Sequence, residues 1–142
     1  MFEHTIDVTW GECDLAGLVY FPRMLDWCHR ALEALWGGLE GGYARFTGPR
    51  RLGIPTVRIA GDFQRPVRYG ERVIVRVGVA RIGTKSVTFR HDVTNAEGAL
   101  CARFEHVIAV CELDGPRAIE VPDDVRALLA PHAIDASDGA TR

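Results

Sequence analysis

One long helical segment precedes four consecutive strand-like segments in this 142-residue chain. Pro22 suits the first position of a helix, where its missing N–H costs nothing, and Gly37-Gly38 suits its end. The apolar positions between them form a wide stripe, made of Met24, Leu25, Trp27, Cys28, Ala31, Leu32, Leu35 and Trp36. A helix this apolar is typical of one that a sheet wraps around, so residues 22–36 are expected at the centre of the fold.

Alternating apolar and polar residues predict strands on both sides of this helix. Residues 2–10 alternate and predict a half-buried strand that reaches Trp10. Further strands are expected over residues 55–64, 71–82, 85–95 and 99–113. The run Asn95-Ala96-Glu97-Gly98 is typical of a turn between the last two. Consecutive strands joined by short turns predict an antiparallel sheet and the α+β class.

The remaining segments predict a single domain. Residues 37–53 are rich in glycine and predict a flexible connection with one helical turn near residues 43–46. Pro122 and two aspartates begin a short helix that ends near residue 130. Hydrophobic residues make up 47% of the chain, which suffices for a packed core. We therefore expect one domain over residues 1–130 and a flexible polar tail over residues 131–142.

Charge and composition exclude several classes of protein. The net charge of -2 disfavours a general nucleic-acid binder, which needs a strongly basic face. No run of about 18 apolar residues could span a membrane, and residues 1–4 do not start a signal peptide. None of the cysteines forms a CxxC pair or a zinc pattern; they are Cys13, Cys28, Cys101 and Cys111. Reduced thiols and a cytoplasmic location are therefore expected.

A carboxylate near the start of the helix is the strongest candidate for chemistry. Residues 11–22 read GECDLAGLVYFP, which places Asp14 in a glycine-bounded loop before the helix N-terminus. Helix N-termini offer unpaired N–H groups and a positive dipole that can hold a developing oxyanion. A carboxylate opposite such donors can attack an acyl carbon or activate water. This pattern favours acyl transfer.

Residue spacing alone leaves structural roles open for the same side chains. Acidic residues before helices mostly cap the helix or face solvent, and Asp14 could do either. His29, His91 and His106 could equally be buried or interface histidines. Cys13 lies between two carboxylates, which disfavours a thiolate and makes it a packing residue.

The segment GECDLAGLVYFP resembles the N-terminal motif of the hotdog-fold acyl-CoA thioesterases. Their 4-hydroxybenzoyl-CoA thioesterase branch has the pattern Gly-Asp/Glu-Cys-Asp-x-Ala-Gly-hydrophobic-Val-aromatic-aromatic-Pro, and the chain is most similar to that branch. Weaker similarity covers roughly residues 5–125. The resemblance implies a long central helix wrapped by a curved antiparallel sheet of about five strands. It also implies homodimers, paired into homotetramers as dimers of dimers, with active sites between subunits.

Carried onto this sequence, the resemblance assigns roles within and just after the motif. Asp14 is the catalytic carboxylate, acting as nucleophile or as general base. The backbone N–H of Phe21 polarises the thioester carbonyl, and Gly17 permits close approach of the chain. Tyr20 and Phe21 line the acyl pocket. His29 occupies a position where the hydroxybenzoyl enzymes carry an acidic residue facing that pocket.

The resemblance also implies a basic site for the phosphates of coenzyme A. Lys85, the only lysine of the chain, matches a family contact position together with Ser86, and Arg117 matches another. Relatives place an arginine pair where this chain has Gly83-Thr84, so a lighter phosphate grip is expected. Additional candidate contacts are Arg65, Arg68 and Arg81. Coenzyme A enters as part of the substrate, and no separate cofactor or metal ion is implied.

The expected activity is hydrolysis of an aryl-CoA, with 4-hydroxybenzoyl-CoA as the leading substrate. A short-chain aliphatic acyl-CoA thioesterase is the alternative, although such relatives often carry Tyr-His where this chain has Phe21-Pro22. A non-catalytic hotdog protein that binds acyl-CoA or an acyl-carrier protein is a second alternative. A hotdog dehydratase is disfavoured because no histidine lies in the segment just before the long helix, residues 11–21.

Overall fold

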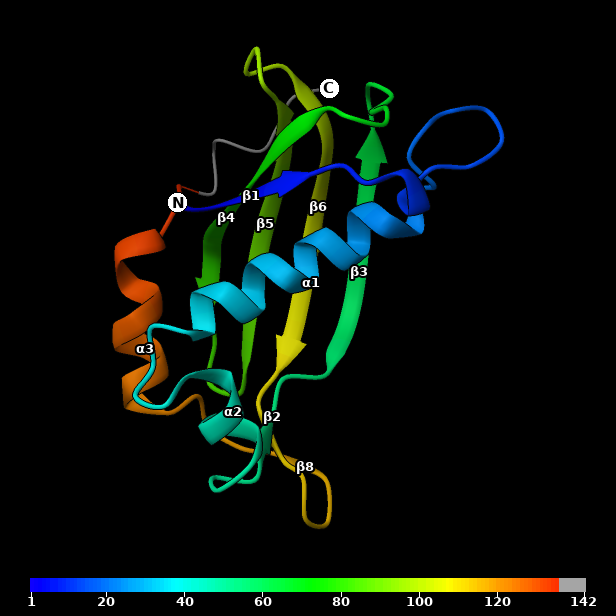
Figure 1. The fold of residues 1–142 in the computed structure, drawn as a ribbon. Coiled ribbons are helices and arrows are strands. Elements are labelled where there is room, and N and C mark those ends of the chain that lie inside the picture. Colours follow the sequence, from blue (N-terminus) through cyan, green and yellow to red (C-terminus); the bar gives the residue numbers. More distant parts are fainter. Residues whose placement is uncertain (136–142) are drawn as a thin grey trace.

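A five-stranded antiparallel sheet wraps around one long helix (Figure 1). The computed structural model describes residues 1–135. The strand order is β1-β4-β5-β6-β3. The strands are β1 (Phe2–Asp7), β4 (Arg72–Ile82), β5 (Ser86–Asn95), β6 (Leu100–Ala109) and β3 (Thr56–Phe63). The sheet and helix confirm the α+β class and the architecture that the motif implied.

Helix α1 (Pro22–Trp36) starts and ends where the proline and glycine signals predict. It crosses one face of the sheet, and Trp27, Ala31 and Trp36 are completely buried. The alternating valines of β4 face it from the sheet side. Burial of these large apolar surfaces is the main force that holds the helix in the curve of the sheet.

The first strand is shorter than the alternation predicts. It ends at Asp7, and the chain then forms the 3-10 turn η1 (Trp10–Glu12). The backbone N–H and the hydroxyl of Thr9 both donate to the Glu12 carboxylate, at 2.7 and 2.8 Å, which stabilises this turn. The expectation that Trp10 lies on the buried strand face was wrong, because the turn leaves its side chain 72% exposed.

The far end of the sheet carries several smaller elements. Helix α2 (Gly42–Thr47) contains the predicted helical turn, and α3 (Asp123–Leu129) is the predicted C-terminal helix. A second sheet joins β2 (Leu52–Gly53), β7 (Cys111–Glu112) and β8 (Arg117–Ala118). It divides the strand that was expected over residues 99–113, because β7 leaves the main sheet after β6.

The expected tail starts beside the sheet. A 3-10 turn, η2 (Ala130–His132), follows α3, and the Ile134 N–H then donates to the Val79 carbonyl at 3.0 Å. The rest of the expected tail, residues 136–142, lies outside the described residues. Within residues 1–135, no helix is both long and apolar enough to cross a membrane.

Candidate active site

The loop that carries Asp14 is closed by its own backbone. Asp14 N–H donates to the Leu18 carbonyl at 2.8 Å, and Gly17 N–H donates back to the Asp14 carbonyl at 3.0 Å. Gly17 has a φ of 75°, a left-handed conformation that favours glycine, which explains this residue better than close substrate approach does. Oδ1 of the exposed Asp14 carboxylate accepts the Ala16 N–H at 2.8 Å. Among the described residues Oδ2 has no partner, so the carboxylate can react with an incoming group.

Glu12 joins the root of this loop to α1. Its carbonyl accepts the Tyr20 N–H at 2.9 Å, and its carboxylate accepts the Trp27 indole N–H at 2.7 Å. Burial by itself raises the pKa of the Glu12 carboxyl, but hydrogen bonds from Trp27 and Thr9 outweigh it and hold that pKa below its usual range. Glu12 is therefore an anionic clamp between the loop and the helix.

The backbone N–H of Phe21 lies where the loop meets α1. Pro22 follows it as the first helical residue and has no N–H of its own. Within residues 1–135, the Phe21 N–H has no hydrogen-bond acceptor. Because Tyr20 is bonded to Glu12, this donor and the Asp14 carboxylate lie on the two flanks of one closed loop. A free N–H at a helix start can polarise a carbonyl group, and a free carboxylate on the same loop can attack it.

An apolar groove opens beside Phe21, between α1 and the edge strand β3. It encloses about 160 Å³, and we call it the α1–β3 groove. Aromatic rings continue into it from the loop: Tyr20 contacts Phe21 at 5.5 Å, and Phe21 contacts Phe63 at 6.0 Å between ring centroids. The groove is lined by Phe21, Leu25, Ile59, Ala60, Gly61, Phe63 and Phe104. Its size and lining suit a flat apolar or aromatic group.

His29 lies one helical turn beyond Leu25, farther from the helix start at Phe21. It is exposed, and the charge it can carry lowers the pKa of His106 on the opposing strand β6, where burial is the larger cause. His106 is hydrogen-bonded on both sides, to Thr56 at 2.8 Å and to His91 at 3.3 Å. The structure thus brings the three expected histidines close together, with His106 between His91 and His29.

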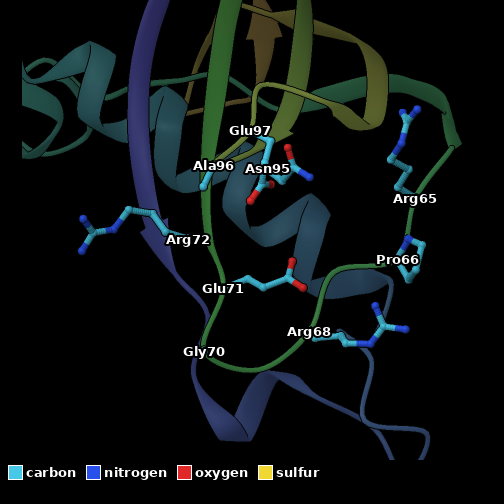
Figure 2. A pocket seen from close by; sticks show the side chains of 9 residues that line it. All are labelled: Arg65, Pro66, Arg68, Gly70, Glu71, Arg72, Asn95, Ala96 and Glu97. Carbon is cyan, nitrogen blue, oxygen red and sulfur yellow. The ribbon is translucent and has the colours of Figure 1, made fainter.

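A larger and more polar pocket lies beside the Asp14 loop (Figure 2). It encloses about 510 Å³ and is contacted by the loop through a bridge between Leu18 and Arg68. Figure 2 shows Glu71 and Glu97 on one side, with Arg65 and Arg68 on the other. The mixture of charges does not suit an acyl group. Arg68 nevertheless pairs with Leu18 of the Asp14 loop, and Arg65 lines a neighbouring pocket together with Leu18 and Phe21.

The main expected phosphate contacts lie at the opposite end of the chain. Lys85 and Ser86 follow the 11-residue strand β4, whereas the Asp14 loop lies where that strand begins. At about 3.3 Å per residue, this separates Lys85 from the Asp14 loop by roughly 30 Å. Arg117 lies at the same far end and donates to Glu112 at 2.9 Å (Figure 1). One chain therefore does not bring these residues to Asp14.

Two groups at the site escaped the sequence analysis. The sequence did not show that Glu12 joins the Asp14 loop to α1 through Tyr20 and Trp27. Its position inside the motif was the only indication that this residue matters. The bonds of His106 to Thr56 and His91 were also missed, because they depend on how β3, β5 and β6 align.

Comparison with known proteins places this site in context. The sequence pattern of the thioesterase-like superfamily matches residues 8–129. A 1,4-dihydroxy-2-naphthoyl-CoA hydrolase from Nostoc punctiforme is 28% identical over 145 residues, which cover 99% of this chain and 94% of the relative. The same name belongs to a relative from Thermosynechococcus vestitus that is 26% identical over 92% of this chain and 90% of its own length.

Solved structures agree with the fold. A thioesterase-superfamily protein from Jannaschia sp. CCS1 is 31% identical, with a TM-score of 0.85 over 94% of this chain and 93% of that one. A mutant 4-hydroxybenzoyl-CoA thioesterase complexed with 4-hydroxybenzoyl-CoA is 25% identical, with a TM-score of 0.81 over 89% of this chain and 96% of that one. These relatives are named for two different aryl acyl groups. The superfamily is therefore shown, but the expected special similarity to the 4-hydroxybenzoyl-CoA thioesterase branch is not.

Proposed function

Because this chain belongs to the thioesterase-like superfamily, we propose that it hydrolyses an aryl-CoA thioester to the free acid and coenzyme A. One observation carries the proposal: a free carboxylate oxygen of Asp14 and the free N–H of Phe21 flank one closed loop beside an aromatic groove. Thioester hydrolysis needs a hydrogen-bond donor to the carbonyl oxygen, a carboxylate and a site for the acyl group. The candidates are the Phe21 N–H, Asp14 and the α1–β3 groove.

The reaction follows from these positions. The thioester oxygen accepts the Phe21 N–H, which stabilises the negative charge that develops on that oxygen. In the nucleophilic route the Asp14 carboxylate attacks the carbonyl carbon and expels the coenzyme A thiolate. Water then hydrolyses the resulting mixed anhydride. In the general-base route Asp14 takes a proton from water, which attacks the same carbon directly. Trapping of an acylated Asp14 in a single turnover distinguishes the two routes.

Two aryl acyl groups are the leading substrates. Relatives carry the name 1,4-dihydroxy-2-naphthoyl-CoA hydrolase, and a similar structure holds 4-hydroxybenzoyl-CoA. The aromatic lining of the α1–β3 groove favours such rings over short aliphatic chains, because offset and edge-to-face ring contacts add to apolar burial. The short-chain aliphatic thioesterase remains the competing function, and equal activity on acetyl-CoA or propionyl-CoA would support it.

We further propose that the complete site forms in a homodimer. All eight residues of the edge strand β3 are exposed, and Val57 is 60% exposed. An open apolar edge of this kind favours pairing with a second strand. Two-fold antiparallel pairing of β3 would bring the partner's far end, with its phosphate-binding candidates, to the Asp14 end of the first chain. Pairing of such dimers would give the homotetramer.

The test is release of free thiol from a panel of aryl and aliphatic acyl-CoAs. We expect the highest kcat/KM on hydroxylated aryl-CoAs. Asp14→Asn should lower kcat by about a hundredfold to ten-thousandfold, which is the usual contribution of a catalytic acid or base. Folding should be unaffected, because Asp14 is exposed. Turnover no higher than that of Asp14→Asn on every substrate, with tight coenzyme A binding by calorimetry, would establish a binding protein instead.

A further inference from the structure

The α1–β3 groove is one of two hollows that meet at Phe21. The neighbouring pocket, which we call the loop pocket, encloses about 300 Å³ between the Asp14 loop and residues 64–67. Phe21 and Phe63 line both hollows, and no other described residue does. Their rings contact edge to face, with centroids 6.0 Å apart. These two rings therefore form the partition between the groove and the loop pocket.

The two hollows differ in the chemistry of their linings. The loop pocket includes Gln64 and Arg65, and it shares Arg65 and Pro66 with the larger polar pocket. The lining of the groove is wholly apolar. The amide-bearing arm of coenzyme A therefore suits the loop pocket, whereas an arene suits the groove. A thioester held at the Phe21 N–H would lie at the partition, with its acyl ring on the groove side.

The groove has room for about one arene ring. Its volume is about 160 Å³. A protein cavity of roughly 150 Å³ that is lined by leucine, isoleucine and phenylalanine holds one benzene molecule. A second fused ring therefore has no place inside the groove unless one of its walls moves.

The base of the groove is fixed. Phe104 lines it and is only 2% exposed, so this ring belongs to the core. It lies opposite Gly61 of β3, and a Cβ on Gly61 would overlap it. A buried ring that is packed this closely against the neighbouring strand cannot yield to a larger acyl group.

Phe63 is the wall that a larger acyl group would meet. Its side chain is half exposed, and its ring contacts Phe104 at 5.4 Å and Phe21 at 6.0 Å between centroids. The backbone beside it is held, because the N–H of the next residue, Gln64, donates to the Cys101 carbonyl at 2.7 Å. Only the ring can move, and moving it gives up contacts with two aromatic neighbours.

We propose that Phe63 limits the acyl group to one arene ring by closing the α1–β3 groove beside Phe21. A single ring fits between Phe104 and Phe63, whereas a second fused ring stays in water or displaces the Phe63 ring. Phe63 is thus a specificity-determining residue. This inference rests on the proposed aryl-CoA hydrolysis, and it favours the benzoyl class over the naphthoyl class among the acyl groups for which the relatives are named.

The test uses benzoyl-CoA and 2-naphthoyl-CoA, which differ by one fused ring. The wild-type protein should have a kcat/KM about tenfold higher on benzoyl-CoA, the lower end of what a hydrophobic pocket discriminates. Phe63→Ala removes one arene ring from the wall and should raise the naphthoyl-to-benzoyl ratio of kcat/KM about tenfold. Phe63→Leu keeps a bulky side chain and should raise that ratio less.

Tyr69→Ala is the matched control. Tyr69 is also half exposed and also contacts another aromatic ring, that of Trp10, but it lines neither hollow. Loss of this side chain should leave the ratio unchanged. A wild-type preference for 2-naphthoyl-CoA, an unchanged ratio in Phe63→Ala or an equal rise in Tyr69→Ala would overturn the inference.

A second measurement does not need turnover. S-phenacyl-CoA and its 2-naphthyl analogue are thioethers that cannot be hydrolysed, and calorimetry gives a Kd for each. The naphthyl-to-phenyl ratio of these Kd values should fall about tenfold in Phe63→Ala. If no acyl-CoA is hydrolysed, the proposed function fails, and this ratio still decides the inference. An unchanged ratio, or no binding of either thioether, would refute it.

Discussion

The Trp27 indole N–H donates to Oε1 of Glu12 at 2.7 Å, and this bond ties the Asp14 loop to the first turns of α1. Trp27 is fully buried, and the Glu12 side chain is only 13% exposed. A charge-assisted hydrogen bond between such rigid groups restricts the position of both. It thereby sets the geometry between the Asp14 carboxylate and the Phe21 N–H.

We expect loss of this bond to impair the chemical step more than binding. Trp27→Phe removes the donor and should lower kcat by about tenfold to a hundredfold, because misplacement by about 1 Å has effects of that size. Glu12→Gln keeps an acceptor oxygen but loses the negative charge that strengthens the bond, so it should lower kcat by less. KM should change by less than about twofold. The double variant should lose little more than Trp27→Phe alone, since both changes act on the same bond. Steady-state kinetics with the preferred acyl-CoA measures these values.

Glu40→Gln is the matched control for the Glu12 experiment. Glu40 pairs with Arg45, but its side chain is 89% exposed and it lies far along the chain from the loop. An exposed ion pair contributes little, so kcat should be unchanged. Fully additive losses in Glu12→Gln and Trp27→Phe would show that the two residues act independently.

The separation of Lys85 from Asp14 predicts complementation between subunits. Lys85→Ala should raise KM about tenfold, the effect of losing one charge-assisted contact, with little change in kcat. A mixed dimer of Lys85→Ala and Asp14→Asn chains contains one site with both native residues and one with neither. In an equimolar mixture that reassociates after partial unfolding, about half of the dimers are mixed, so about a quarter of all sites should regain the wild-type kcat and KM. Absence of any component with the wild-type KM would place both residues of one site on the same chain.

Gly61 lines the α1–β3 groove and lies opposite Phe104 of β6. A Cβ there would overlap the Arg103 carbonyl oxygen and the Phe104 ring. We expect Gly61→Ala to lower the free energy of unfolding by about 1–3 kcal/mol, because the edge strand must shift to make room. Urea unfolding measures this change. Gly11→Ala is the control, since no described atom lies within 4 Å of its Cβ position, and it should have a much smaller effect.

The buried His91 predicts a pH dependence of stability. Burial lowers its pKa in the folded state to about 3, below the ordinary 6.5, so the unfolded chain binds the extra proton first. The contribution of neutral His91 to the free energy of unfolding is complete above about pH 6.5. It is lost as the pH falls toward 3, by about 1.4 kcal/mol per pH unit. The free energy of unfolding of His91→Leu should fall less steeply between pH 6 and pH 4. Equal slopes in both proteins would show that His91 takes up its proton without unfolding.

Much of the fold could be predicted because its signals are local. Pro22 and the glycine pair after Trp36 bound the helix, and the alternating valines of β4 mark a strand with one buried face. These patterns act over a few residues, where backbone geometry and side-chain period are directly coupled. The limits of β1 were less predictable, because the Thr9–Glu12 bonds compete with strand extension.

The candidate site likewise has features that the sequence predicts and features that depend on the tertiary structure. The sequence by itself determined the loop with Asp14, the helix start at Phe21 and the apolar character of α1, since each depends on neighbours along the chain. Only the tertiary structure decided that Glu12 meets Trp27, that His106 links His91 to Thr56, and that Lys85 lies at the far end from Asp14. Those relationships depend on strand order and register, which are set by packing of the whole sheet around α1 and have no signal in any short segment.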